Sequence, residues 1–324
     1  MLIVSVLNDY LSFFNKLNAN HSLFNKESRN FVPYCLSILF NVMKTVLFKC
    51  IFLFSLAGFF IGCNTGAKKI SENPIQFDSL FVEKTYHFFD VDTNPKCLLQ
   101  INFVYPVNYS NKEILNLTLQ QFVSVYFGDD YKTLTPKDAA EKYADNFINA
   151  YKEIEKEFKV EMENHDMEEF DETWYANEES SSNQIVYNRN DLLSLVVSKG
   201  YYYGGAHGGH NYANRVIDLK TGRRIMEDEI FEDDYHDDLA KIIIDVIALS
   251  HNVEMAELEN IGFYNLDEIS SNNNFYVDEI GITYTYNEYE IAAYVLGAVS
   301  VQIPYENIRH LLRRESPLSD IAFR

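Results

Sequence analysis

The sequence LVVSKGYYYGGAHGG occupies residues 195–209 and decides the fold of the region around it. Apolar and polar residues alternate on both sides of its glycines, from Leu192 to Tyr203 and from Asn211 to Asp218. Alternation with a period of two is typical of β-strands that bury one face. Glycines permit the backbone angles of a tight crossing between strands. We therefore predict two neighbouring antiparallel strands joined by this glycine loop.

Outward from this pair, further strands are predicted by the same alternation. Pro106 is expected to end one of them, since proline cannot donate to a sheet. The predicted strands are Phe77–Asp92, Cys97–Tyr105, Glu172–Glu178, Gln184–Asn190, Asn274–Ile280, Gly281–Tyr286 and Val299–Ile303.

Helices are predicted where apolar residues recur with a period close to 3.6. One covers residues 110–127 with Ser110 as its N-cap, and a longer one starts at Thr135 and Pro136. Residues 235–251 form a third, and Tyr305–Arg313 a short last helix. Together these elements predict an α+β fold, with antiparallel sheets packed by a few helices in two consecutive modules.

The segment from Met43 to Cys63 has the pattern of a bacterial lipoprotein export signal. Lysines at 44 and 49 precede a 12-residue apolar core, Cys50 to Ile61, and Gly62 stands before Cys63. A transmembrane helix needs about 20 residues, so the core is short for a span. We predict lipidation of Cys63, the first mature residue, and a lipid-anchored position on the outer membrane facing the periplasm. An uncleaved anchor that includes the apolar run 31–43 is the alternative.

This signal divides the chain. Residues 1–42 are expected not to belong to the native protein, residues 43–63 form the signal and residues 64–74 form a tether. From Cys63 onward the chain holds 22 basic and 46 acidic residues, a formal charge of −24. Such a charge repels nucleic acid and anionic lipids and attracts cationic partners, or it serves solubility alone. Cys97 is expected to be a buried, unpaired thiol.

Two stretches carry a family resemblance. Residues 195–209, together with 216–222, look like the join between the accessory module of PdaC-type peptidoglycan deacetylases and the C-terminal domain of RsiV-type anti-sigma factors. Residues 275–297, followed by the strand 301–305, are similar to the closing motif of the RsiV-type domain. The resemblance implies modules at 75–212 and 213–313, with a tail at 314–324. It also implies an envelope module that recognises cell-wall-related ligands or proteins.

The candidates for chemistry are few. His207 and His210 could share a zinc ion with a third ligand, His236, Asp233 or Asp234; alternatively, His207 satisfies backbone groups in a tight glycine crossing. The acidic run 227–238 lacks the spacing of a calcium loop and is expected to be the solvated start of a helix. No nucleophile elbow or phosphate loop is present in the sequence. We therefore predict no catalytic residue, metal or cofactor.

Tyrosines surround the glycine loop and crowd the closing motif. Exposed tyrosines beside such a loop suit a saccharide or protein surface, although ordinary half-buried sheet tyrosines are the alternative. The predicted ligand-binding residues are Tyr201, Tyr202, Tyr203, His207, His210, Tyr212, Tyr286 and Tyr289.

The function predicted from the sequence is a non-catalytic, lipid-anchored envelope protein. Its partner would be a peptidoglycan-related ligand or a basic envelope protein such as lysozyme. One alternative is a metal-dependent cell-wall glycan hydrolase or deacetylase that uses His207 and His210. Another is a structural subunit of an envelope assembly.

Overall fold

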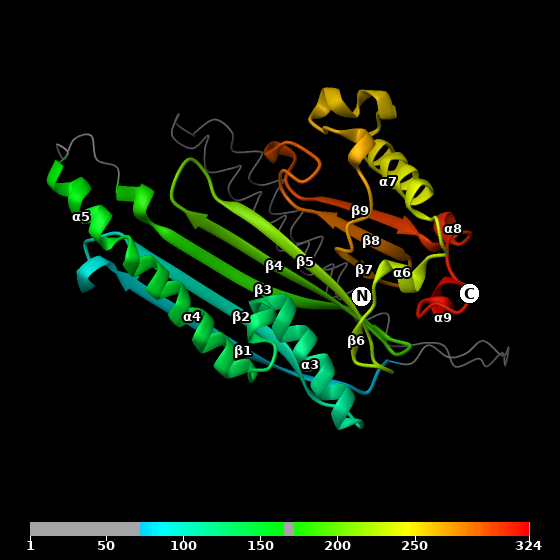
Figure 1. The fold of residues 1–324 in the computed structure, drawn as a ribbon, viewed down its shortest axis with the longest axis horizontal. Helices are drawn as coiled ribbons and strands as arrows, with labels where there is room; N and C mark the ends of the chain where they lie inside the picture. Colours follow the sequence, from blue (N-terminus) through cyan, green and yellow to red (C-terminus); the bar gives the residue numbers. More distant parts are fainter. Residues whose placement is uncertain (1–71, 165–171, 324) are drawn as a thin grey trace, which may run out of the picture. The chain divides into compact units, whose positions relative to one another are not determined.

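A computed structural model describes residues 72–164 and 172–323 of the chain (Figure 1). Two sheets, of six and of three strands, are packed by helices, which confirms the predicted α+β fold with antiparallel pairing in both sheets. In the described residues, no helix is both long and apolar enough to cross a membrane. The predicted export signal, Cys63, residues 1–42 and most of the tether lie outside the described residues.

The six-stranded sheet follows the order of the chain, and all its neighbours are antiparallel except β2 and β3. Three helices separate β2 from β3, and a parallel pair requires such a crossover. The sequence did not predict this parallel pair. The strands are β1 (Gln76–His87), β2 (Lys96–Asn108), β3 (Asn177–Arg189), β4 (Leu192–Tyr203), β5 (Gly209–Asp218) and β6 (Arg223–Arg224).

One face of this sheet is covered by α3 (Lys112–Phe127) and α4 (Pro136–Glu153), with α5 (Glu155–Asn164) beyond them (Figure 1). Leu193, Leu195 and Val197 of β4 point to this covered face and are buried against the helices. Alternate residues point to the opposite, open face. Asn111, not Ser110, caps α3, whereas Thr135 caps α4 as predicted.

The three-stranded sheet packs against α7 (His236–His251). Leu239, Ile243 and Ile247 of this helix are buried in the hydrophobic core that it shares with the sheet. Its strands are β7 (Phe275–Val277), β8 (Gly281–Tyr286) and β9 (Val299–Pro304). The remaining helices are α6 (Glu227–Ile230), α8 (Tyr305–Ile308) and α9 (Ser319–Ala322), with 3-10 turns at Phe88–Asp90, Asp129–Tyr131, Glu172–Tyr175, Met255–Ile261, Leu266–Glu268 and Tyr294–Leu296.

Part of the open face is covered by the second sheet. Ser194 of β4 donates to the carbonyl of Val277 at 2.7 Å, and Asn214 of β5 donates to the Thr285 hydroxyl at 2.8 Å. Residues 212 and 213, where the sequence places the boundary between modules, are neighbours within β5. The rest of the open face, toward the glycine loop, borders the candidate site.

Several further local predictions are wrong, and the strand predicted over 77–92 ends at His87, before the 3-10 turn at 88–90. Residues 172–175 form a 3-10 turn, and the two strands expected over 172–190 are the single strand β3. Pro106 lies inside β2, which tolerates it because β3 pairs only with residues 97–102 and leaves an edge at Pro106. The helix predicted over 305–313 is α8, which ends at Ile308, since the chain soon turns to bond residues 230–232: Arg313 N donates to Ile230 O at 2.9 Å. A further short helix, α9, follows it.

Candidate functional site

The candidate site is a groove of about 490 Å³ between the open face of β3–β5 and the second sheet. We call it the intersheet groove. Tyrosine rings and valines lie beside amide, hydroxyl and carboxylate groups, the mixture typical of small-molecule sites. The first sheet contributes Gln184, Val186, Val196, His210 and Tyr212, and the second part of the chain contributes Tyr276, Thr285, Glu288, Gly297, Ala298 and Ser300.

Glu288 is fixed in the groove wall by the backbone and ring of His210. The Glu288 Oε2 accepts from the His210 N–H at 3.1 Å, and Oε1 lies 3.3 Å from the His210 Nδ1. The Glu288 side chain is 11% exposed, whereas that of His210 is 62% exposed. In the part of the chain that the structure describes, no lysine or arginine is ion-paired with Glu288. The groove therefore has a positioned carboxylate with free hydrogen-bonding capacity.

Side-chain amides join β5 to the segment that carries Glu288. Asn287 accepts from the Tyr212 N–H at 2.7 Å and donates to the Tyr212 carbonyl at 3.1 Å. Asn274 donates to the same carbonyl at 3.0 Å. These side-chain bonds to the Tyr212 backbone replace the backbone hydrogen bonds of a paired strand, and they hold the groove wall against β5.

Three rings form an aromatic stack beside the groove: His207, Tyr294 and Tyr289. The centroids of His207 and Tyr294 are 4.1 Å apart, and those of Tyr294 and Tyr289 are 5.5 Å apart, with nearly parallel planes. The Tyr289 hydroxyl lies 3.3 Å from the His207 Nε2, and the Tyr294 hydroxyl donates to the Gly208 carbonyl at 2.9 Å. These contacts attach the glycine loop to the closing motif, residues 275–297.

Tyr289 ends this stack with an exposed ring and an unusual backbone. Its side chain is 56% exposed and its φ is +67°, a region that bulky residues rarely adopt. Such a conformation costs on the order of 1–3 kcal/mol and persists only where the surroundings impose it. The Tyr264 hydroxyl holds the turn by donating to the carbonyls of Tyr289 and Ala292.

The structure separates the residues predicted to bind ligand. His210 and Tyr212 line the groove, and His207 and Tyr289 belong to the aromatic stack. The Tyr202 hydroxyl donates within the loop, to Gly205 O at 2.9 Å.

The other three predicted tyrosines lie away from the groove. Tyr201 and Tyr203 stack on each other at 5.1 Å and share the covered-face side of β4 with Lys199. Tyr286 is 1% exposed and donates to Ser270 O at 2.7 Å, so no ligand can reach it in this conformation. Strand alternation explains the split, because consecutive tyrosines face opposite sides.

Glu288 and Gln184 were missed by the sequence analysis. Glu288 lies within the closing motif, residues 275–297, between Asn287 and Tyr289, yet it is one of 48 acidic residues. Only its position opposite His210 distinguishes it.

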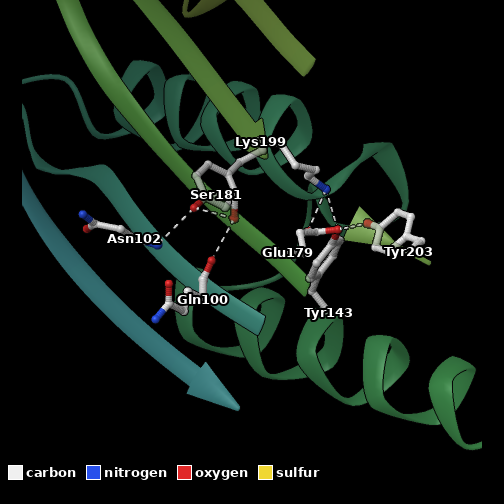
Figure 2. Close-up of polar contacts among 8 residues, drawn as sticks. Gln100, Asn102, Tyr143, Glu179, Ser181, Lys199 and Tyr203 are labelled. Carbon is white, nitrogen blue, oxygen red and sulfur yellow. Dashed lines mark hydrogen bonds and ion pairs between the residues drawn. The ribbon is translucent and has the colours of Figure 1, made fainter. Parts of the chain in front are cut away.

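A second polar network lies on the covered face, centred on Glu179 of β3 (Figure 2). Glu179 is 3% exposed. Its Oε1 lies 3.0 Å from the Lys199 Nζ and accepts from the Tyr143 hydroxyl at 2.6 Å, while Oε2 accepts from Tyr203. Burial first, and then the bond to Glu179, raise the pKa of both tyrosines. With three donors, Glu179 ties α4 to β3 and β4.

Next to it, Figure 2 shows Ser181 of β3 bonded toward β2. The Ser181 hydroxyl donates to the Gln100 carbonyl at 3.4 Å and accepts from the Tyr126 hydroxyl at 3.0 Å. Tyr126 in turn accepts from the Asn102 N–H at 3.2 Å. These contacts join α3 to the parallel pair of strands.

The two histidines considered for zinc have different partners. The His207 Nδ1 lies 2.8 Å from the Gly208 carbonyl, consistent with a histidine that satisfies the backbone of the crossing, and His210 contacts Glu288. Across residues 72–164 and 172–323, no group of three His, Cys, Asp or Glu side chains is arranged to hold a metal ion.

The sequence predicted that the acidic run 227–238 is solvated, and this is wrong for Glu227. Glu227 is 1% exposed and accepts from the Tyr235 hydroxyl at 3.1 Å, the Ser271 hydroxyl at 2.5 Å and the Asn273 N–H at 2.7 Å. These three bonds compensate for its burial.

Comparison with known proteins finds two consecutive regions that match family models. Residues 93–210 match the family model described as deacetylase PdaC, and residues 228–306 match DUF3298, a family of proteins of unknown function. The chain is therefore similar to PdaC over its first described region and to DUF3298 over the second, which confirms the predicted PdaC-type resemblance. The RsiV-type assignment of the second region stays a prediction.

Solved structures agree with this assignment. A DUF3298 family member from Bacteroides fragilis NCTC 9343 is 28% identical, with a TM-score of 0.72 over 78% of this chain and 98% of its own. A DUF3298 family protein from Pseudomonas aeruginosa PAO1 is 12% identical, with a TM-score of 0.51 over 75% of this chain and 96% of its own, a likeness of fold alone. No curated protein matches the chain.

Proposed function

We propose that the chain is a non-catalytic envelope protein that binds a peptidoglycan-related ligand in the intersheet groove. The observation that carries the proposal is the positioned carboxylate of Glu288 among the rings of Tyr212 and Tyr276. A sugar ring has apolar C–H faces and a rim of hydroxyl groups. Tyrosine rings suit the faces, and carboxylate, amide and hydroxyl groups suit the rim.

We also infer that the protein is exported and anchored through Cys63 on the periplasmic side of the outer membrane. The support is the sequence pattern of residues 43–63. Replacing Cys63 with serine would release the protein from the membrane fraction, and mass spectrometry of the wild-type N-terminus would find diacylglycerol on Cys63. An unmodified cysteine with the signal retained would contradict the anchor.

Thermal unfolding of the purified full chain tests the ligand. A ligand that binds only the folded state stabilises it by RT ln(1 + [L]/Kd), about 2.7 kcal/mol at about 100 Kd. Soluble peptidoglycan fragments should therefore raise Tm with increasing dose. Lysozyme, tested in parallel, represents the basic protein partner that the formal charge of −21 of the full chain would attract.

A blocked groove provides the matched control. Ser300 of β9 is exposed and lines the groove, whereas Gln302 is exposed on the same strand and side, two residues away. Ser300→Trp should abolish the shift caused by the fragments, and Gln302→Trp should keep it. A shift with lysozyme alone, or a fragment response that survives Ser300→Trp, would overturn the groove as a glycan site.

A further inference from the structure

The aromatic stack and Glu288 together indicate which kind of sugar the groove accepts, an inference that rests on the proposed function. Tyr289 directly follows Glu288 in the chain, and His207 lies three residues before His210. Glu288 and His210 line the groove, and the exposed ring of Tyr289 follows Glu288 directly, outside the lining itself.

The carboxylate lacks a strong counter-charge. The imidazole of His210 is the ionisable partner of Glu288 within the described residues, and it is 62% exposed to solvent. The Glu288 side chain itself is 11% exposed, so water solvates its charge poorly. A bound cation would gain a charge-assisted hydrogen bond there, which is stronger than a neutral one.

The tyrosine ring favours the same charge. A cation placed over an aromatic face is attracted by the ring quadrupole. The Tyr289 ring is backed by Tyr294 and His207, so it is held in place before any ligand arrives. The Tyr289 hydroxyl also lies 3.3 Å from the His207 Nε2, and the backbone at Tyr289 has a φ of +67°.

We propose that the groove binds glycans whose amino sugars carry a free ammonium group, in preference to their N-acetylated forms. Glu288 accepts from the ammonium, and Tyr289 stacks on the sugar face beside it. An acetamide in the same position has no positive charge and gains neither the ion pair nor the cation–π attraction.

Isothermal titration of the full chain tests this preference with two defined probes, a glucosamine tetramer and an N-acetylglucosamine tetramer, at a pH where the amine is protonated. The glucosamine tetramer should bind about tenfold more tightly. Raising the salt concentration should reduce its affinity more than that of the neutral tetramer, since salt screens charge interactions.

Two variants assign the effect to the named groups. Glu288→Gln should abolish the preference, while Glu259→Gln, an exposed acid outside the groove lining with the same change of net charge, should keep it. Tyr289→Leu should weaken both tetramers about tenfold, and Tyr201→Leu, an exposed tyrosine on the covered-face side, should not.

Each outcome has one meaning. Equal affinities in the wild type, or a preference that survives Glu288→Gln, overturn the inference and leave the proposed function standing. Unchanged binding in Tyr289→Leu overturns the role of the aromatic stack. If neither tetramer binds and peptidoglycan fragments give no thermal shift, both the inference and the proposed function fall.

Discussion

The covered and open faces of the first sheet are made from alternate residues of the same strands, yet they differ in chemistry. On β4, Leu193, Leu195 and Val197 are buried under α3 and α4. Their neighbours Val196 and Ser198 point to the open face and stay partly exposed. Along this stretch of β4 the covered face holds apolar contacts, and the open face borders the groove. Stability and binding are thus separated by a period of two.

The largest expected effect tests this separation directly. Leu195→Ala should lower the free energy of unfolding by about 2–5 kcal/mol, because it leaves a cavity beneath the helices. Val196→Ala, on the next residue and the opposite face, should cost about 1 kcal/mol, since its side chain is only partly buried. Urea titration measures both. Similar losses in the two variants would show that the two faces contribute equally to the free energy of unfolding.

The next effect concerns the network around Glu179 on the covered face. Glu179→Gln leaves the Lys199 ammonium, which is 25% exposed, without its ion pair and should cost about 2 kcal/mol. Glu178→Gln changes the neighbouring, exposed acid and should stay within about 0.5 kcal/mol. Chemical denaturation of both variants compares them. A Glu179→Gln variant as stable as Glu178→Gln would mean that the network fixes geometry without stabilising the fold.

A smaller effect of opposite sign is expected near the open face. Tyr289→Gly removes strain of about 1–3 kcal/mol and loses a ring stack of about 0.5–1.5 kcal/mol. The net change should be a gain of about 1 kcal/mol, accompanied by weaker ligand binding. Calorimetric Tm and ligand titration follow the two quantities separately. A clear fall in Tm would place Tyr289 among the residues that stabilise the fold.

The smallest effect comes from pH. A hydrogen bond to Glu155, with smaller contributions from burial and nearby acids, raises the pKa of Tyr86 to about 12. Between pH 10 and 12 the unfolded chain loses this proton and the folded chain keeps it, so stability is full below pH 10 and falls as pH rises toward 12. Glu155→Gln should make that fall shallower. An unchanged alkaline profile would assign the loss to other tyrosines, such as Tyr143 and Tyr203, whose pKa values burial raises.

Much of the local structure follows from the sequence. The bounds of β4 and β8 agree with the prediction at every residue, and α7 differs only at its first residue. Cys97 is buried and unpaired, as expected. These features depend on residues close together in the chain, where side-chain period, caps and turn residues act directly.

Tertiary structure alone decided the rest. The parallel pairing of β2 and β3 and the tolerance of Pro106 depend on a crossover of three helices. The roles of the acids depend on distant partners: Glu179 meets α4, Glu227 meets the turn before β7, and Glu288 meets His210, 78 residues away. The sequence does not show which groups surround an acidic residue in the folded chain. Those groups determine whether its carboxylate stabilises the core or faces a ligand.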